Sequence, residues 1–91
     1  MELRVLQYFL VVAREENITR AAAFLNITQP TLSRQLMQME EELGVKLFRR
    51  GKHSIVLTED GMLLRRRAQE IVDLAEKTAK ELMHGEEAVS G

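Results

Sequence analysis

Cysteine and tryptophan are both absent from this 91-residue sequence, which also has a single proline. Without cysteine, neither a disulfide nor a Cys-based zinc site can reinforce the fold. The two histidines, His53 and His84, are far apart in the sequence and form no recognisable set of metal ligands. A domain this small buries a modest fraction of its surface. Its stability is therefore expected to come from helix packing, with dimerisation as a further source.

Long hydrophobic runs are also missing. No segment reaches the roughly 20 apolar residues that a membrane-spanning helix needs. The apolar run VLQYFLVVA is short, contains Gln7 and leads directly into Arg14 and two glutamates. It lacks the basic leader and the small-residue cleavage site of a signal peptide. We therefore expect a core helix in a cytoplasmic protein with no membrane partner.

A large net charge is lacking too, because the formal net charge is −1. The charges are unevenly spread, however. Residues 17–57 contain six lysines and arginines against three consecutive glutamates, a local net charge of +3. Binding to nucleic acid follows the local potential more than the net charge of the whole chain. This segment is therefore a candidate binding surface.

The residues that are plentiful favour helices, among them alanine, leucine, glutamate and arginine. Residues 3–16 predict a first helix with a wide apolar face. A second, barely two turns long, is predicted over residues 19–26, with Thr19 as its N-cap. A third is capped by Thr28, carries Pro30 in its first turn and ends at Gly44. A tight turn between the second and third helices gives a helix-turn-helix pattern.

The segment after Gly44 changes character. Several residues between 45 and 56 favour strands, and RRGKHS is a turn centred on Gly51. We expect a short two-stranded hairpin with a basic tip. Thr58 then caps a last helix that runs to about Met83 and would be roughly 37 Å long.

The last helix carries apolar and small residues at heptad spacing. These residues are Leu64, Ala68, Ile71, Ala75, Thr78 and Leu82. The seam could pack entirely on its own domain or on the same helix of a second copy. The length of the helix and the lack of a further apolar element favour the second copy.

The exposed face of the third helix is the first candidate site. With Leu32 at the centre of the buried face, this face carries Pro30, Thr31, Ser33, Arg34, Met37 and Gln38. Polar side chains of this length can bond base edges in a major groove, and arginine pairs well with guanine. The alternative is a solvated polar face, which is the fate of most such faces.

The hairpin tip is the second candidate. Its basic residues are Arg49, Arg50, Lys52 and His53. Taken alone, they could form a charged loop that serves solubility. Phosphate contacts dominate DNA affinity and arginine suits a narrow minor groove, so a basic hairpin after a helix-turn-helix favours double-stranded DNA as the partner.

Catalysis finds little support in the sequence. Ser33 and Ser54 have no evident histidine and acidic partners, and there is no glycine-rich phosphate loop. We therefore expect no enzymatic activity, no metal and no cofactor. The rival hypothesis is a helical module that dimerises and docks a partner protein, which explains the seam but not the basic hairpin.

The order of these features resembles the N-terminal domain of the LysR-type transcriptional regulators. The resemblance rests on the short capped helix, TQPTLSRQ, EEELGVKLF, the basic hairpin and LTEDG, and it runs from about Leu3 to Met83. It implies a mainly α fold: a winged helix-turn-helix over residues 1–58, with the helix-turn-helix at about 18–37 and the wing at about 46–57. A linker helix over residues 59–83 would pair two subunits, and residues 84–91 would be a hinge or tail.

The resemblance also implies residue roles by matched position. Gln29, Pro30, Thr31, Ser33 and Arg34 would face the major groove. Thr28 would cap the helix and hold a phosphate, while Arg50 and the wing tip would approach the neighbouring minor groove. His53 stands where the family often has arginine, so a strong minor-groove contact is not expected there.

The family further implies a C-terminal domain that binds a small-molecule effector and that this chain lacks. We therefore expect the DNA-binding fragment of a longer bacterial regulator, with a tetramer as one assembly open to the full-length protein. The fragment would act as a homodimer on an inverted repeat, with half-sites about 34 Å apart.

Overall fold

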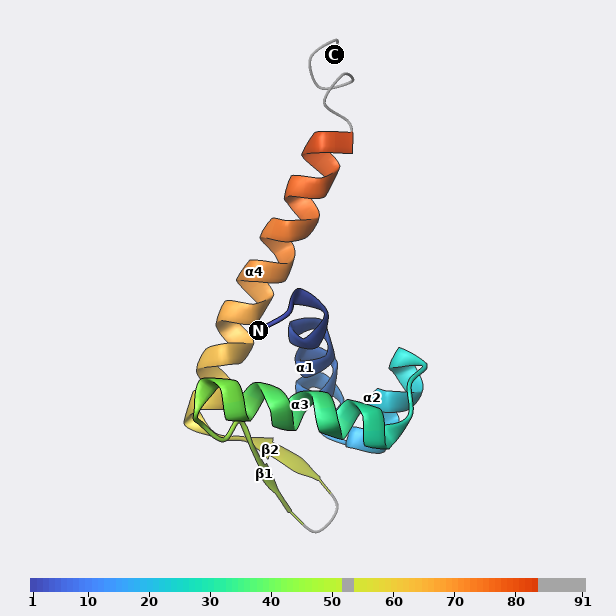
Figure 1. Cartoon of the computed structure of the whole chain (residues 1–91), viewed down its shortest axis with the longest axis vertical. Coiled ribbons are helices and arrows are strands. Elements are labelled where there is room, and N and C mark those ends of the chain that lie inside the picture. The colour runs from blue at the N-terminus through green and yellow to red at the C-terminus, as the bar shows by residue number, and fades with distance from the viewer. Residues whose placement is uncertain (52–53, 84–91) are drawn as a thin grey trace.

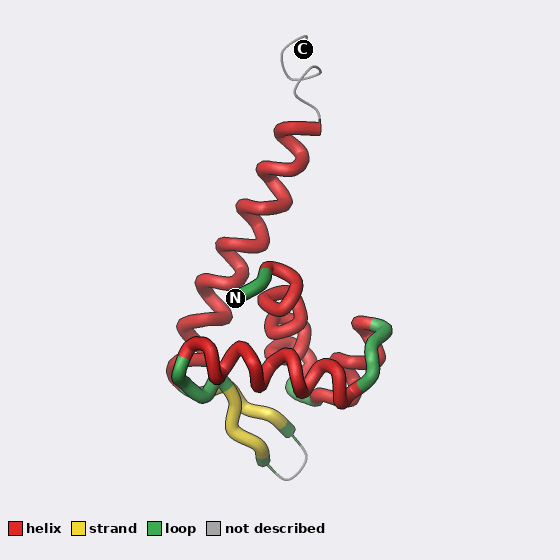
Figure 2. Tube along the Cα trace, in the orientation of Figure 1, coloured by secondary structure: helices red, strands yellow, loops and turns green. Residues whose placement is uncertain are grey.

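The computed structural model describes residues 1–51 and 54–83. Its elements are α1 (Leu3–Glu15), α2 (Ile18–Leu25), α3 (Gln29–Leu43), β1 (Phe48–Arg50), β2 (Ile55–Leu57) and α4 (Glu59–Met83). The first three helices pack together, the two strands extend from them, and α4 projects well beyond (Figure 1; Figure 2). The predicted fold is confirmed: a mainly α winged helix-turn-helix followed by a long helix.

The core forms where α1 meets the other elements. Phe9 and Val12 of α1, Leu32 of α3 and Leu47 are covered almost completely. The ring of Phe9 lies 5.3 Å from that of Phe48, measured between centroids, at a tilt of 45°. This contact anchors the base of the wing on α1. The other buried apolar residues are Val5, Leu6, Ala21, Ala22, Leu36, Met39, Ile55, Ala68 and Val72.

The start of α2 corrects the prediction that Thr19 is its N-cap. The N-cap is Asn17, whose Oδ1 accepts a hydrogen bond from the backbone N–H of Arg20 at 2.8 Å. Glu16, just before it, has a left-handed backbone with φ of 56°. This turn brings Asn17 into the extended conformation of a cap, and asparagine is at least as good a cap as threonine.

Both predicted ends of α3 are confirmed. The Thr28 side chain accepts a hydrogen bond from Thr31 N at 3.3 Å, and Pro30 lies in the first turn. Gly44 ends the helix with φ of 71°, a conformation that suits glycine. Because a cap defines each end, α3 is one continuous helix from Gln29 to Leu43.

The predicted hairpin is confirmed as a two-stranded antiparallel wing. Its register pairs Phe48 with Leu57 and Arg50 with Ile55. The backbone N–H of Ile55 also donates to the Glu16 carbonyl at 3.0 Å, which ties the wing to the turn before α2. Two residues of the predicted tip, Lys52 and His53, lie outside the described residues.

The structure contradicts one residue of the predicted heptad seam on α4, Ala68, and the rest of the seam stays a prediction. Ala68 is fully buried by its own domain, and Leu64 packs partly buried against the same core. By contrast, Ile71 and Leu82 are exposed. A straight α-helix turns 100° per residue, so residues at strict heptad spacing shift gradually around its surface. On α4 the heptad residues lie between the buried face and an exposed stripe.

The exposed stripe lies roughly a quarter turn from the buried face, counting 100° per residue. It consists of Leu63, Ile71, Leu74, Thr78 and Leu82. The stripe adjoins the buried face on one side and polar residues on the other, and the exposed Arg67 lies within it. Within the described part of the chain, no helix has both the length and the apolar character needed to cross a membrane.

Candidate nucleic-acid interface

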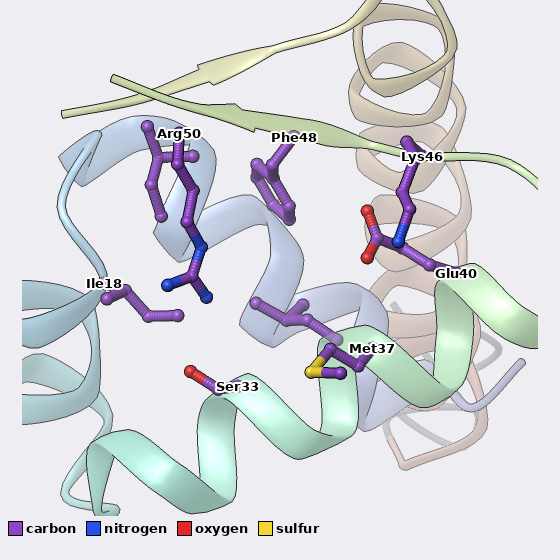
Figure 3. A pocket seen from close by; sticks show the side chains of 9 residues that line it. Ile18, Ser33, Met37, Glu40, Lys46, Phe48 and Arg50 are labelled. Atoms are coloured by element: carbon purple, nitrogen blue, oxygen red, sulfur yellow. The ribbon is translucent and has the colours of Figure 1, made fainter. Parts of the chain in front are cut away.

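The exposed face of α3 and the wing border a common groove. The groove has a volume of about 330 Å³ and is drawn in Figure 3. Its lining residues are Ile18, Ser33, Leu36, Met37, Glu40, Lys46, Phe48, Arg50 and Ile55. The floor is largely apolar, while the polar and charged groups come from α3, the connection after it and β1. The tertiary structure thus brings together the two candidate sites, the exposed face of α3 and the hairpin, which the sequence predicted separately.

The first turn of α3 holds its polar side chains in fixed positions. Thr28 Oγ1 donates a hydrogen bond to Thr31 Oγ1 at 2.8 Å, in addition to accepting one from Thr31 N. Gln29 Nε2 donates to Ser33 Oγ at 3.1 Å. The predicted cap role of Thr28 is confirmed by these contacts. Its predicted phosphate contact stays a prediction, and its hydroxyl hydrogen is engaged with Thr31.

The remaining predicted residues of α3 differ in exposure. Pro30, Arg34 and Gln38 are exposed, whereas Thr31 and Ser33 are half-buried. Met37 is an exposed apolar side chain in the middle of this otherwise polar face, with 54% of its surface accessible. The face therefore offers hydrogen-bonding groups that flank one apolar side chain, and both kinds of group can contact base edges in a major groove.

Two basic side chains, Lys46 and Arg50, line the groove together with the acidic side chain of Glu40. Arg50 points from β1 toward Ile18 and Ser33 (Figure 3). In the described part of the chain, the ion pairs involve Met1, Arg4, Arg14 and Arg67 as cations. Arg34, Lys46, Arg49 and Arg50 belong to none of them. Among the described residues, Lys46 and Arg50 thus bring positive charge to the groove, while Arg49 lines a separate hollow with Glu59 and Asp60.

Two residues of the groove were missed by the sequence reasoning as site residues. Lys46 follows α3 and lines the groove beside Glu40 (Figure 3). Glu40 has a structural role, because its Oε2 accepts the backbone N–H of Leu47 at 2.7 Å. The local charge of +3 was the available signal for Lys46. No sequence signal distinguished Glu40 from the two glutamates that follow it.

Comparison with known protein families identifies the family to which this chain belongs. Residues 3–62, from the start of α1 into the first turn of α4, match the family described as bacterial regulatory helix-turn-helix protein, lysR family. The chain belongs to the LysR family. The matched segment includes α3, the whole wing and the groove between them, so the LysR assignment rests on the part of the chain that carries the candidate interface.

Relatives and solved structures agree with this LysR assignment. The HTH-type transcriptional regulator BsdA of Bacillus subtilis (strain 168) is 45% identical over 92 residues, covering 100% of this chain and 32% of BsdA. The BenM DNA-binding domain in complex with catB site 1 DNA matches with a TM-score of 0.91 at 35% identity, covering 97% of this chain and 95% of that chain. The CbnR DNA-binding domain in complex with DNA has a TM-score of 0.89 at 35% identity, covering 93% and 98%. The chain spans about a third of the length of BsdA.

Proposed function

We propose that this LysR-family chain binds double-stranded DNA sequence-specifically, as the DNA-binding part of a bacterial transcriptional regulator. The observation that carries the proposal is the groove shared by α3 and the wing, bordered by Lys46 and Arg50, neither of which forms an ion pair within the described residues. The BenM and CbnR domains, which share this fold at 35% identity, are bound to DNA. In the proposed complex, α3 enters the major groove and the wing approaches the adjacent minor groove.

The proposed contacts fall into two groups: contacts to DNA base edges, and contacts to DNA phosphates and the minor groove. Base edges are assigned to Gln29, Pro30, Thr31, Ser33, Arg34 and Gln38. Phosphates and the minor groove are assigned to Thr28, Arg49, Arg50, Lys52 and His53. This assignment is supported by the position of α3 beside the wing (Figure 1) and by the exposure of Arg34, Arg49 and Arg50.

One DNA strand separates the major groove from the minor groove, so its backbone must pass between α3 and the wing. The groove in Figure 3 lies at that place. Lys46 and Arg50 border it with positive charge, and Phe48 adds an apolar surface to its lining. We therefore assign the sugar–phosphate backbone of one strand to this groove.

We also propose that two copies pair through α4 on an inverted repeat, with half-sites about 34 Å apart. Residues 1–58 would then contact DNA and residues 59–83 would pair the subunits. The exposed stripe supports this pairing, because five mostly apolar residues on one side of a helix are otherwise left in water. The proposed contact centres on Ile71, Leu74 and Thr78 and excludes Ala68.

The wider role is proposed from the relatives. Because BsdA and AlsR are both named as transcriptional regulators, we propose a cytoplasmic protein without enzymatic activity. This chain covers 32% of BsdA and 29% of AlsR. Response to a small-molecule effector, and assembly beyond a dimer, are therefore assigned to a further domain outside this chain.

Arg34→Ala is expected to weaken binding to a preferred duplex by about 2 kcal/mol, because one bidentate contact to a base edge is worth about 1–3 kcal/mol. Arg34 is exposed on α3 and has no ion pair with residues 1–51 or 54–83, so its loss should leave the fold intact. The measurement is fluorescence anisotropy with a duplex selected from a random library and with a scrambled duplex. Binding to the scrambled duplex should change much less.

Arg50→Ala is the matched control for Arg34→Ala. Loss of a phosphate contact should weaken binding to both duplexes alike and reduce the slope of log K against log salt by about 0.9. If Arg34→Ala behaves in the same way as Arg50→Ala, α3 does not read bases at Arg34. If the unchanged chain binds neither duplex at low salt while dimeric, the proposed function is wrong and the docking-module hypothesis is favoured.

Ile71→Asp is expected to weaken dimerisation about ten-fold or more, because it places an unpaired charge in the proposed contact between two α4 helices. Ile71 is 40% exposed in the single chain, so the change should spare the monomer fold. Sedimentation equilibrium measures the dimer constant. Val56→Asp, at an exposed apolar residue of the wing, serves as the control and should leave the constant unchanged. An unaltered dimer in the Ile71 variant would rule out this stripe as the interface.

A further inference from the structure

Two polar side chains of α3 are joined before any DNA is present. Gln29 and Ser33 are one helical turn apart, which places them side by side on the helix surface. Gln29 Nε2 donates a hydrogen bond to Ser33 Oγ at 3.1 Å, and both residues are half-buried. The contact therefore lies within the face assigned to base reading, at its N-terminal end.

This contact restricts the carboxamide of Gln29. A glutamine side chain carries one acceptor oxygen and two N–H donors, and its terminal torsion is broad when it is free. The bond to Ser33 engages one of the donors. Oε1 and the second N–H remain available, and together they form a donor–acceptor edge.

Adenine presents the complementary edge in the major groove. Its N6 amino group donates and its N7 accepts, and glutamine binds the pair in a bidentate manner. Both hydrogen bonds need the carboxamide in one plane and one orientation. A side chain already held there loses less rotamer freedom when DNA binds than a free side chain would.

We propose that Ser33 is a positioning residue for Gln29, and that the held carboxamide of Gln29 recognises an adenine. The inference rests on the proposed DNA-binding function, adds to it the identity of one base pair, and replaces the direct base contact assigned to Ser33 with a positioning role. The backbone beneath the pair is fixed as well, because the Thr28 cap and Pro30 define the first turn of α3.

Direct contact between Ser33 and DNA is the competing role. Ser33 also lines the groove, and Figure 3 shows it below the side chain of Arg50. In that role Ser33 would bond a phosphate or a base of its own. The two roles differ in one measurable respect: a positioning residue acts only through Gln29, whereas a direct contact acts independently of Gln29.

A double-mutant cycle separates these roles. The 91-residue chain first selects a preferred duplex from a random library. Kd is then measured by fluorescence anisotropy for that duplex and for each of its single base-pair variants. The proteins are the unchanged chain, Gln29→Ala, Ser33→Ala, the double variant and Ser33→Thr, and each is checked by circular dichroism melting.

Gln29→Ala is expected to reduce the preference for A·T at one position by about five-fold or more, the effect of losing one bidentate contact. Ser33→Ala should reduce the preference at the same position. The double variant should match Gln29→Ala, with no further loss. Ser33→Thr keeps a hydroxyl on the same carbon and should restore the preference.

Four results would overturn the inference. Ser33→Ala could leave the preference intact, shift it at a different base pair, or add its loss to that of Gln29→Ala; each shows that Ser33 does not act through Gln29. An unchanged preference in Gln29→Ala would remove the adenine contact. Failure of the unchanged chain to select any duplex is a separate result, which would refute the proposed function itself.

Discussion

Phe9→Ala is expected to lower the free energy of unfolding by about 3–5 kcal/mol, the usual cost of removing a buried phenylalanine ring. Phe9 is 0% exposed and its ring contacts that of Phe48. Neighbours such as Val12 and Leu32 are themselves fully buried, so they have little freedom to fill the cavity. A domain of this size has a total stability of about 5–15 kcal/mol, and the variant should lose a large share of it.

Urea denaturation followed by circular dichroism measures the effect of Phe9→Ala. The matched control is Phe24→Ala, the same chemical change at a ring that is 62% exposed. The Arg14 guanidinium lies 4.4 Å from the centre of the Phe24 ring, so the control should cost about 0.5–1 kcal/mol. Equal losses in the two variants would contradict the placement of Phe9 at the centre of the core.

Gly61→Ala should destabilise the domain by about 3 kcal/mol, at the upper end of the range for overpacking. An added Cβ at Gly61 would overlap the carbonyl oxygen of Leu47 and lie 3.1 Å from Cδ2 of Leu57. That carbonyl cannot easily move, because it accepts a hydrogen bond from Thr58 N at 3.0 Å. Thr58 Oγ1 in turn donates to the Lys46 carbonyl at 2.6 Å and accepts from Gly61 N at 3.0 Å.

Gly51→Ala is the control for Gly61→Ala. A Cβ at Gly51 would meet the nearest atom, the Ser54 carbonyl oxygen, at an ordinary distance of 3.4 Å. Thermal melting of the two variants and the unchanged chain gives the comparison. If the Gly61 variant has the same melting temperature as the unchanged chain, α4 does not approach the Leu47 backbone so closely. Because this contact sets the direction of α4 relative to the wing, the variant should also weaken binding to a two-half-site duplex.

Local signals in the sequence predicted most helix ends correctly. Thr28 and Gly44 define α3 because a hydroxyl cap and a left-handed glycine act on the backbone within a few residues. The start of α2 was predicted wrongly because Asn17 and Thr19 are both suitable caps. The left-handed turn at Glu16 makes Asn17 the cap, and nothing in the local residue types distinguished the two.

The candidate site was predicted in part. Helical periodicity around Leu32 placed Arg34 on the outer face of α3, where the structure has it. Lys46 was left out of the site because it belongs to a connection, and connections have no periodicity from which a direction can be read. The hydrogen bond between Glu40 and Leu47 was missed for a related reason, since it joins residues seven positions apart across the end of a helix.

By itself, the sequence determined the element types, the order of the helix-turn-helix and wing, and the polar outer face of α3. These features depend on interactions between residues a few positions apart, which act in any tertiary setting. The tertiary structure alone decided that α3 and the wing share one groove, and that Ala68 faces the core while Ile71 faces solvent. A heptad spacing of apolar residues indicates only that a helix has an apolar side. Which part of that side is covered by its own domain depends on where α1 lies against α4, a contact between segments about 60 residues apart in the sequence.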